Sequence, residues 1–460
     1  MNNMNEDNWD KVFKSAGIES QIQKARHLLK EYKGDKYTFG ISCLDAVAKY
    51  ILEFGDNTLL IISQSSWAAP LRKKVLNILE KNEIKIKAEV GTSAPNTPLE
   101  DVIKLADVIR KMNPASITCV GGGSAIDCAK DANALVSVGE SPEDLEKFFG
   151  VNEVSKIAVQ KNKKLYPLIT VEVAAGSGTH LSKNANVTFH KLNQKKLISD
   201  DILVPDRAVF DYSTTITTSI DLTLDGAMDG LSHSLEVYYG ADINKIGIES
   251  FKKLEDVCLT SISMIVNTLP KLINDLKNIK YREIIGLATD LGGYALMLGG
   301  TGGAHLNSFS LVDILTHGRA CAVLNPYYTV FFAPAIKDKL IKIADIYKDH
   351  IKKEAMGKSD SPVFENIGFE NTKSRQLGEI VAKAMINFSM KIGFPVKLND
   401  IKGFSDRHID RILEAAKNPQ LEMKLKNMPV PLNAQQIDDF MRPVLLAAKT
   451  GDFSYIKNIT

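Results

Sequence analysis

Four side chains in the second half of the sequence have the types and spacing of a divalent metal site. Asp229 and His233 are four residues apart, and His305 and His317 each stand close to glycine. On a helix, residues four apart share a face, so Asp229 and His233 could hold one cation together. Nitrogen and oxygen ligands without thiolate suit Fe²⁺, Zn²⁺, Co²⁺ or Mn²⁺. An isolated pair is more often an ordinary helix contact, but the two later histidines favour a metal.

A run of three glycines could bind the phosphates of a nucleotide. Gly121, Gly122 and Gly123 follow an apolar stretch and precede Ser124 and Asp127. Glycines let the backbone approach a ligand closely, and a helix start offers free N–H groups to a pyrophosphate. Ser124 is the expected N-cap of that helix, and Asp127 could fix the loop or hold a ligand hydroxyl. The alternative is a tight strand-to-helix turn, because the run matches neither common nucleotide-binding fingerprint.

A second glycine-rich turn, at residues 174–179, also follows a predicted strand. Its small residues would let the backbone lie against a flat ligand such as nicotinamide, or against a phosphate. Both turns should open on the same edge of a parallel sheet, where ligands of such sheets bind. The two turns would then form one binding surface.

The elements that must position these residues alternate between strand and helix in the first 210 residues. Short apolar runs predict strands, and apolar residues at helical spacing predict helices. The predicted strands are 58–63, 84–90, 116–120, 165–170 and 185–190, and the predicted helices are 70–82 and 99–111. This alternation indicates a parallel sheet covered by helices on both faces.

The character of the chain changes near Asp211. From about Leu222 the pattern is helical almost to the end, apart from a polar stretch at 356–372 that predicts a long loop. We therefore expect an α/β dinucleotide-binding domain over residues 1–212 and an all-helical, metal-binding catalytic domain over 213–460. A cleft between two domains is a preferred place for a ligand.

The composition argues against polyanion and lipid partners. The 57 Lys and Arg against 55 Asp and Glu give a net charge of +2, which predicts neither nucleic-acid nor membrane binding. No window reaches the roughly 18 uninterrupted apolar residues of a membrane span, and the first ten residues do not have the pattern of a signal peptide. The five cysteines contain no C-x-x-C pair, which fits a reducing compartment. We expect a cytoplasmic protein.

Several segments, in order along nearly the whole chain, resemble the iron-containing (group III) alcohol dehydrogenase family. Residues 121–130 match the family's GGGSxxDxAK signature, and residues 228–236 match its MDALxHAxE helix. The other matches are a PNP-type loop at 95–97, an AGTGS turn at 175–179, a P-x-x-x-x-x-D segment at 205–211, histidine turns at 302–305 and 316–318, and a turn at 393–395. Together these segments are far more specific than any one of them.

The resemblance implies a two-domain fold like that of dehydroquinate synthase, and a metal-dependent alcohol dehydrogenase or aldehyde reductase. It implies Fe²⁺ or Zn²⁺ as the ion, with these ligands and catalytic residues: Asp229, His233, His305 and His317. NAD or NADP would be held by residues of the two turns and nearby: Gly121, Gly122, Gly123, Ser124, Asp127, Thr170 and Ser177. It further implies a homodimer or higher homo-oligomer that acts on a small alcohol or aldehyde.

Some positions depart from the family pattern. Phe309 stands where the family often has a histidine close to the nicotinamide, so a proton relay through that residue would be absent or replaced. His180 replaces the family's glutamate after the AGTGS turn. The interval from His305 to His317 is two residues shorter than is typical, so the connecting loop must differ.

The residues that follow the predicted strand at 58–63 bear on the choice between NAD and NADP. Gln64 lies where NAD-preferring members often have an aspartate that holds the 2′-hydroxyl, which makes Gln64 a candidate cofactor residue. The absence of that aspartate, with Arg72, Lys73 and Lys74 close by, favours NADP.

In the expected mechanism, the metal acts as a Lewis acid on the substrate oxygen, and hydride passes between the carbinol carbon and the nicotinamide. The alternative is a lyase, because sugar-phosphate cyclases that resemble dehydroquinate synthase share this plan with NAD and a metal. Those enzymes need extra basic residues for the substrate, and beside His305 and His317 only Arg319 offers one. A non-catalytic binding protein is disfavoured because the ligand set is complete.

Overall fold

A parallel sheet forms the core of the first half of the chain. The computed structural model describes residues 17–351 and 369–459, so the loop expected at 356–372 lies almost entirely outside the described residues. The strands of the sheet are β1 (Tyr37–Gly40), β2 (Asn57–Ile62), β3 (Lys85–Val90), β4 (Ser116–Gly121), β6 (Leu168–Glu172) and β9 (Arg207–Asp211). Their order is β1-β9-β6-β4-β2-β3, and each neighbouring pair is parallel.

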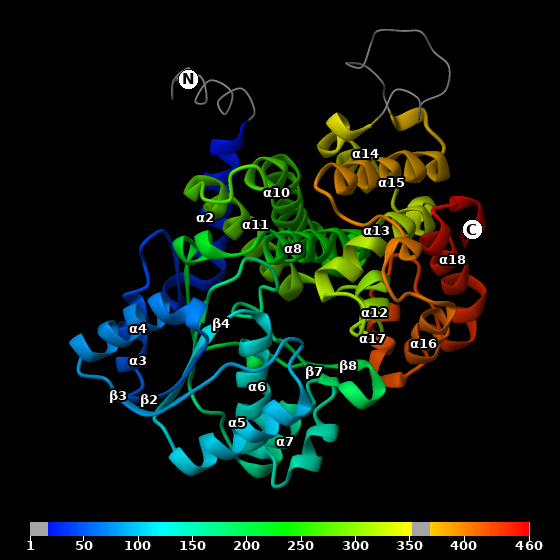
Figure 1. Cartoon of the computed structure of the whole chain (residues 1–460). Coiled ribbons are helices and arrows are strands. Elements are labelled where there is room, and N and C mark those ends of the chain that lie inside the picture. Colours follow the sequence, from blue (N-terminus) through cyan, green and yellow to red (C-terminus); the bar gives the residue numbers. More distant parts are fainter. Residues whose placement is uncertain (1–16, 352–368, 460) are drawn as a thin grey trace, which may run out of the picture.

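Helices cover both faces of this sheet (Figure 1). They are α3 (Ala46–Leu52), α4 (Ala69–Lys81), α5 (Leu99–Met112), α6 (Gly123–Val138) and α7 (Glu153–Lys161). Leu60 and Ile62 of β2 pack in one core with α3 and α4, whereas Leu59 and Ile61 pack in another with α5 and α6. Because β2 is buried on both faces, its sequence is a continuous apolar run, and this is why the strand was predictable.

The strand expected at 185–190 is present but belongs to a different sheet. It is β7 (Asn184–Phe189), which pairs antiparallel with β8 (Gln194–Ser199). With the short β5 (Gly150–Val151) these strands form a sheet of order β5-β8-β7. The backbone N–H of Lys195 in β8 donates to the carbonyl of Phe309 at 3.1 Å, so this small sheet touches the helical half.

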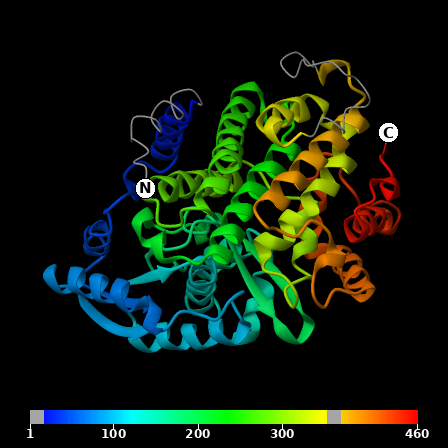
Figure 2. The same cartoon turned by 45° about the horizontal axis from the view of Figure 1, so that its top comes forward.

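The second half of the described chain is helical. Its helices are α8 (Ile220–Gly240), α9 (Ile243–Ile246), α10 (Ile248–Leu272), α11 (Ile279–Leu298), α12 (Gly303–Ser308), α13 (His317–Phe332), α14 (Lys337–Ile346), α15 (Ser374–Lys391), α16 (Asp406–Ala416), α17 (Glu422–Lys426) and α18 (Arg442–Thr450). The fold class predicted from the sequence is therefore confirmed. Figure 2 shows these helices stacked over the sheet half. α8 lies in the middle of the helical half (Figure 1).

The first described helix, α2 (Ile18–Lys33), packs on the helical half rather than on the sheet (Figure 1). The Gln21 side-chain amide donates to Ser263 Oγ of α10 at 2.8 Å, and Lys24 pairs with Asp256 at 2.5 Å. We propose that the chain divides into domains at 1–212 and 213–460. In this division α2 belongs to the first domain by sequence but packs on the second.

The two halves meet backbone to backbone at the second glycine turn. Gly178 has φ +61°, and a Cβ there would lie 2.3 Å from the Cα of Gly293 in α11. A Cβ at Gly226 of α8 would lie 1.9 Å from the carbonyl oxygen of Ala175. Glycine is therefore required on the turn and on the helices that contact it.

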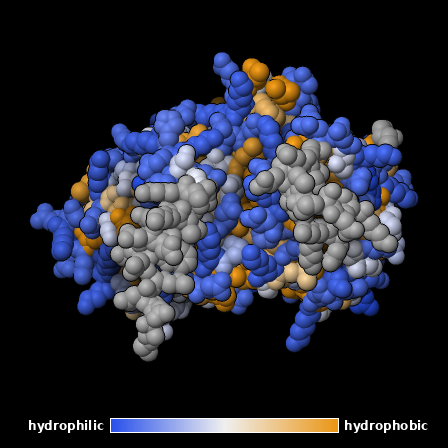
Figure 3. Space-filling view, turned by 90° about the horizontal axis from the view of Figure 1, so that it is seen from above, coloured by the Kyte–Doolittle hydropathy of each residue, from blue (hydrophilic) through white to orange (hydrophobic). Residues whose placement is uncertain are grey.

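The helices of the described ranges differ from a membrane span in length or in apolar character. None of them is both long enough and apolar enough to cross a membrane. The face seen in Figure 3 is mostly hydrophilic, with apolar side chains scattered over it.

Candidate metal and cofactor site

The four sequence-predicted ligands come together from three helices. Asp229 and His233 lie one turn apart on α8, His305 lies in α12, and His317 is the first residue of α13. The Nε2 atoms of His233, His305 and His317 lie 3.8, 3.7 and 3.9 Å from Asp229 Oδ1. Ligand atoms about 2.1 Å from one tetrahedral metal would lie about 3.4 Å apart. These distances would let Asp229 share a cation with each of the three histidines after a small contraction.

The hydrogen bonding of these groups fits a cation. Asp229 Oδ1 and His305 Nε2 are buried, and neither has a hydrogen-bond partner in the described structure. Burial raises the pKa of Asp229 to about 6, and it holds the pKa values of His233 and His317 well below their usual range. Both of these imidazoles are therefore neutral, which is the form that binds a metal. Buried polar atoms without partners are costly, and a bound ion would satisfy them.

Glu236 orients one of the ligands without being a ligand itself. It lies two turns after Asp229 on the same face of α8, and its Oε1 accepts from His305 Nδ1 at 2.5 Å. Its Oε2 accepts from the backbone N–H of Gly302 at 2.9 Å. These bonds leave Nε2 of His305 directed at the ligand cluster. A carboxylate behind a ligating histidine is a usual feature of metal sites.

The start of α13 is tied to α8 by Asp225, one turn before Asp229. Its carboxylate accepts from Thr316 Oγ1 at 2.8 Å and from Arg319 Nε at 2.8 Å. These bonds hold His317 over α8, although the loop between His305 and His317 is shorter than in the family pattern.

Cys321 also lies in the ligand cluster, which the sequence did not suggest. Ligand atoms of Cys321, Asp229, His305 and His317 all lie within 4.8 Å of one another. Burial raises the pKa of the thiol well above its usual range, so it is a neutral neighbour. Its position four residues after His317 on α13 was the available signal, because that spacing returns to the same helix face.

The glycine triplet connects β4 to α6, as predicted. The helix begins at Gly123, and the backbone N–H groups of residues 125 and 126 bond to the carbonyl of Gly122. The expectation that Ser124 is the N-cap was wrong, because Gly122 occupies that position without a side-chain bond. Ser124 Oγ instead accepts from the backbone N–H of Asn96 at 2.9 Å, which ties the turn to the preceding loop.

The two glycine turns touch each other at the carboxyl edge of the sheet. A Cβ placed on Gly123 would lie 2.8 Å from Ser177 Oγ, and a Cβ on Gly122 would lie 3.3 Å from the Cβ of Ala174. β4 and β6 are adjacent and parallel, so both turns leave from the same edge. They form one continuous backbone surface, as the sequence predicted.

Asp127 and Lys130 of α6 hold the second turn in place. Asp127 Oδ1 accepts from Thr179 Oγ1 at 2.6 Å. Lys130 Nζ donates to the carbonyls of Thr179, Ser182 and Asn184 at 2.7, 2.8 and 2.9 Å. Of the two roles open to Asp127 in the sequence, the structure shows that it fixes the loop.

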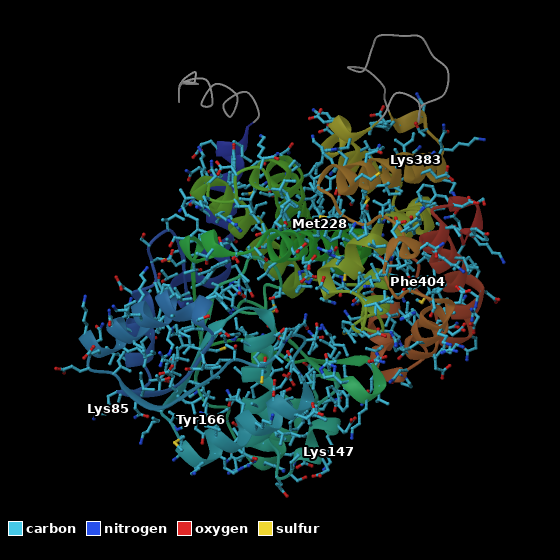
Figure 4. The ribbon with its side chains drawn as sticks, in the orientation of Figure 1. Lys85, Lys147, Tyr166, Met228, Lys383 and Phe404 are labelled. Carbon is cyan, nitrogen blue, oxygen red and sulfur yellow. The ribbon has the colours of Figure 1, made fainter. Side chains whose placement is uncertain are left out.

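One cavity contains both the ligand cluster and the glycine turns. Its volume is about 280 Å³. Figure 4 labels Met228, the neighbour of Asp229, on α8 near the middle of the molecule. The predicted residues that line it are Gly123, Ser124, Asp127, Ser177, Asp229, His233, His305 and His317. The cavity also exposes Lys195 and Lys424, two charged groups that sequence reasoning missed.

Four predicted cofactor residues do not line this cavity. Gly121 and Gly122 lie behind Gly123, where they allow the turn to pack. Thr170 is fully buried inside β6, and its hydroxyl faces the carbonyl of Arg207 at 3.4 Å. Gln64 lies at the end of β2, where its amide donates to Glu89 Oε1 at 2.8 Å. Thr170 is therefore excluded from our proposed site.

Comparisons with known proteins agree with this geometry. Residues 34–212 match the iron-containing alcohol dehydrogenase family, and residues 223–444 match the C-terminal part of the Fe-containing alcohol dehydrogenase family. This chain belongs to the iron-containing alcohol dehydrogenase family. The family predicted from the sequence is confirmed.

Relatives within this family show moderate identity. Alcohol dehydrogenase 4 of Schizosaccharomyces pombe is 29% identical over 290 residues, which span 62% of this chain and 64% of that protein. NADH-dependent butanol dehydrogenase B of Clostridium acetobutylicum is 27% identical over 202 residues, 44% of this chain and 49% of that protein. The match thus spans less than two thirds of each relative.

Solved structures share the fold over most of the chain. The alcohol dehydrogenase from Oenococcus oeni superposes with a TM-score of 0.72 at 21% identity, covering 90% of this chain and 97% of that one. This chain therefore shares its fold with that protein over most of its length.

His180, which replaces a family glutamate, faces away from the cavity. It is buried between two carboxylates, with Nδ1 3.1 Å from Glu172 Oε2 and Nε2 3.1 Å from Asp290 Oδ1. The hydroxyls of Tyr37 and Tyr212 donate to Asp290 Oδ2 at 2.5 and 2.8 Å. Since Asp290 belongs to α11, this polar cluster joins the sheet to the helical half.

Phe309 lines the cavity at the position where the family often has a histidine. Its ring centroid lies 5.8 Å from that of His317, and its side chain is buried. A phenyl ring has no titratable group, so the side chain of Phe309 cannot take up or release a proton as a histidine would.

Proposed function

We propose that this protein is a metal-dependent alcohol dehydrogenase or aldehyde reductase that transfers hydride between a nicotinamide dinucleotide and a small alcohol or aldehyde. One observation carries the proposal. The side chains of Asp229, His233, His305 and His317 converge in the same cavity as the glycine turn at Gly123. Membership of the family and the names of the relatives support it.

The chain's own residues would prepare the site in defined ways. Asp229 and the three histidines would hold Fe²⁺ or Zn²⁺, and Glu236 would fix the ring of His305 by its bond to Nδ1. When bound, the ion supplies Lewis acidity toward the substrate oxygen, and the dinucleotide supplies or accepts hydride. Burial of Asp229, His233 and His305 would limit the access of competing water, whereas His317 is half-buried.

The glycine turns would hold the dinucleotide at the edge of the sheet. The N-terminus of α6 offers free backbone N–H groups beside Gly123 and Ser124, and an anion is stabilised there by the helix dipole. Ser177 of the second turn lies against Gly123, so the phosphate surface continues toward the ligand cluster.

We propose NAD(H) as the preferred carrier, although the sequence favoured NADP. That preference depended on a missing aspartate and on three nearby basic residues, of which Arg72 is paired with Glu89, with Nη2 2.8 Å from Oε2. Gln64 also donates to Glu89. A carboxylate at the ends of β2 and β3 can accept from a ribose 2′-hydroxyl and would repel a 2′-phosphate. A homodimer or higher homo-oligomer stays a prediction.

The lyase alternative is not favoured, because the family matches and the named relatives are alcohol dehydrogenases. Arg319, the one basic residue that the sequence offered beside His317, is paired with Asp225 at 2.8 Å and with Asp221 at 3.3 Å.

The proposal is tested by oxidation of NADH or NADPH with short aldehydes after reconstitution with Fe²⁺ or Zn²⁺. The metal-loaded protein should turn over, and His305→Ala should lose the ion and about 10³-fold or more in kcat/KM. His27→Ala, which changes an exposed histidine, is the matched control and should behave like the wild type. Full activity of a metal-free His305→Ala protein would contradict the proposal.

A further inference from the structure

Two lysines line the cavity, and they belong to different parts of it. Lys195 Nζ lies 3.3 Å from Asn96 Oδ1, and the backbone of Asn96 bonds to Ser124 of the phosphate turn. Lys424 of α17 lies on the other side, because its Nζ is 5.1 Å from the ring centroid of Phe309, which in turn contacts His317. Lys424 therefore lies beside the ligand cluster. Lys195 lies beside the dinucleotide region, and its charge also acts on Asp229 and His317.

Lys424 is buried without a carboxylate partner. It is 5% exposed, and its Nζ donates to Thr301 Oγ1 at 2.6 Å. The described ranges contain no ion pair to this ammonium group. Burial lowers its pKa to about 8, so the side chain is still mostly charged at neutral pH. The carboxylates of Glu236 and Asp229 act on it only through space. A buried charge without a direct ion pair is costly unless a ligand supplies one.

The surroundings of Lys424 limit what that ligand can be. Phe309 and Leu296 line the cavity with apolar surface, and Thr301 already satisfies one of the three ammonium protons. A small molecule that reaches from the ligand cluster to Nζ would therefore be short, apolar in the middle and negatively charged at its far end.

We propose that Lys424 binds the anionic group, a carboxylate or phosphonate, of a short aldehyde or alcohol whose oxygen lies at the metal site. This inference rests on the proposed function, because it assumes that the ligand cluster receives the carbonyl or hydroxyl. The ammonium forms a charge-assisted hydrogen bond with the anion, and the aldehyde end is thereby aligned with the dinucleotide. Lys424 is thus a substrate-binding residue that determines specificity.

The test compares aldehydes that differ only in their far end. With the metal-loaded protein and NADH, kcat/KM is measured for 4-oxobutanoate against butanal, and for phosphonoacetaldehyde against propanal. The wild type should prefer at least one anionic substrate to its neutral partner, and Lys424→Met should lower that ratio at least about 10-fold. Lys424→Arg should retain much of the preference. Equal use of both classes by the wild type would overturn the inference, as would equal losses for both classes in Lys424→Met.

A matched control and a binding readout separate this inference from the proposed function. Lys426→Met changes an exposed lysine on the same helix and should leave the ratio unchanged. Calorimetric titration of the metal-loaded proteins with 4-hydroxybutanoate should show at least about 10-fold weaker binding to Lys424→Met. If no aldehyde is reduced, the proposed function fails, whereas the titration still decides on Lys424. Equal affinity of the two proteins, with equal metal content, would refute the anion site.

Discussion

At the scale of single residues, the geometry of the proposed metal site depends on a carboxylate outside the set of candidate ligands. Glu236 accepts from Nδ1 and the backbone N–H of His305, and from the backbone N–H of Gly302. These bonds fix the tautomer and the orientation of the ring, so that Nε2 is the free nitrogen. The orientation of the His305 ring is therefore set from α8, which also carries Asp229 and His233.

Replacing Glu236 by glutamine should weaken metal binding about 10- to 100-fold while the fold persists, because the ring loses its charged acceptor. Competition with a chromophoric chelator measures this change. Glu249→Gln alters an exposed glutamate of α10 and serves as the control. Unchanged metal affinity in Glu236→Gln would mean that the ring of His305 is held by other contacts.

Glu89 is a second single residue with a testable role, because its carboxylate should disfavour the binding of NADPH. Glu89→Gln removes the carboxylate that pairs with Arg72, so the freed guanidinium can meet a 2′-phosphate. We expect the ratio of kcat/KM for NADPH to that for NADH to rise about 10-fold. Glu80→Gln, an exposed change on α4, should leave the ratio as it is. A ratio that stays constant in Glu89→Gln would place the ribose elsewhere.

The sequence indicated the candidate ligands but not the charges around them. Asp229, His233 and the two later histidines were visible because each has a chemical type and a spacing that imply a metal. Lys195 and Lys424 carried no such signal, since β8 and α17 meet at the cavity only after folding. A lysine in a sequence rich in lysines looks like a surface residue until its burial is known.

At the scale of elements, α6 organises the cofactor side of the cavity. Its N-terminus carries the glycine triplet, and one turn later Asp127 bonds to Thr179 of the second turn. Lys130, buried with its Nζ among three backbone carbonyls, connects the same helix to the segment before β7. The helix thus determines the distance between the two turns.

Lys130→Met should destabilise the protein by about 3 kcal/mol, because three buried carbonyls lose their donor at about 1 kcal/mol each. Denaturant unfolding followed by circular dichroism measures the change. Lys156→Met on α7 removes a single exposed ion pair and is expected to cost under about 1 kcal/mol. Equal stabilities of these two variants would show that Lys130 does not clamp the turns.

Prediction of elements succeeded where burial leaves a clear pattern. β2 and β4 were visible as apolar runs, because both of their faces are covered. β1 was missed because its four residues include Thr38 and end in Gly40, which gives no run and little alternation. The strand β7 was found, but its antiparallel partner could not be identified without knowledge of the turn between them.

At the scale of the whole molecule, the buried cluster around His180 couples the sheet to the helices. Burial alone would lower the pKa of His180, but its bonds to Asp290 and Glu172 outweigh that effect and raise the pKa to about 9. An unfolded histidine titrates near 6.5. The folded protein therefore holds this proton more tightly, and the resulting stability is complete below about pH 6.5 and is lost as the pH rises toward 9.

The free energy of unfolding of the wild type should fall relative to that of His180→Gln by up to about 3 kcal/mol between pH 6.5 and 9. Unfolding curves of both proteins across this range measure the difference. Lys130 and Lys424, whose pKa values are about 8, titrate in both proteins and cancel in the comparison. Parallel profiles would show that His180 is not charged in the folded protein.

The central claim is that side chains from three helices close around one cation that faces the glycine turns. X-ray anomalous diffraction from zinc-loaded crystals locates the ion most directly. We expect one strong peak per chain, about 2.0–2.2 Å from Asp229 Oδ1 and from the Nε2 atoms of His233, His305 and His317, and no such peak in Asp229→Ala. A peak bound by other residues, or an undiminished peak at this position in Asp229→Ala, would contradict the account.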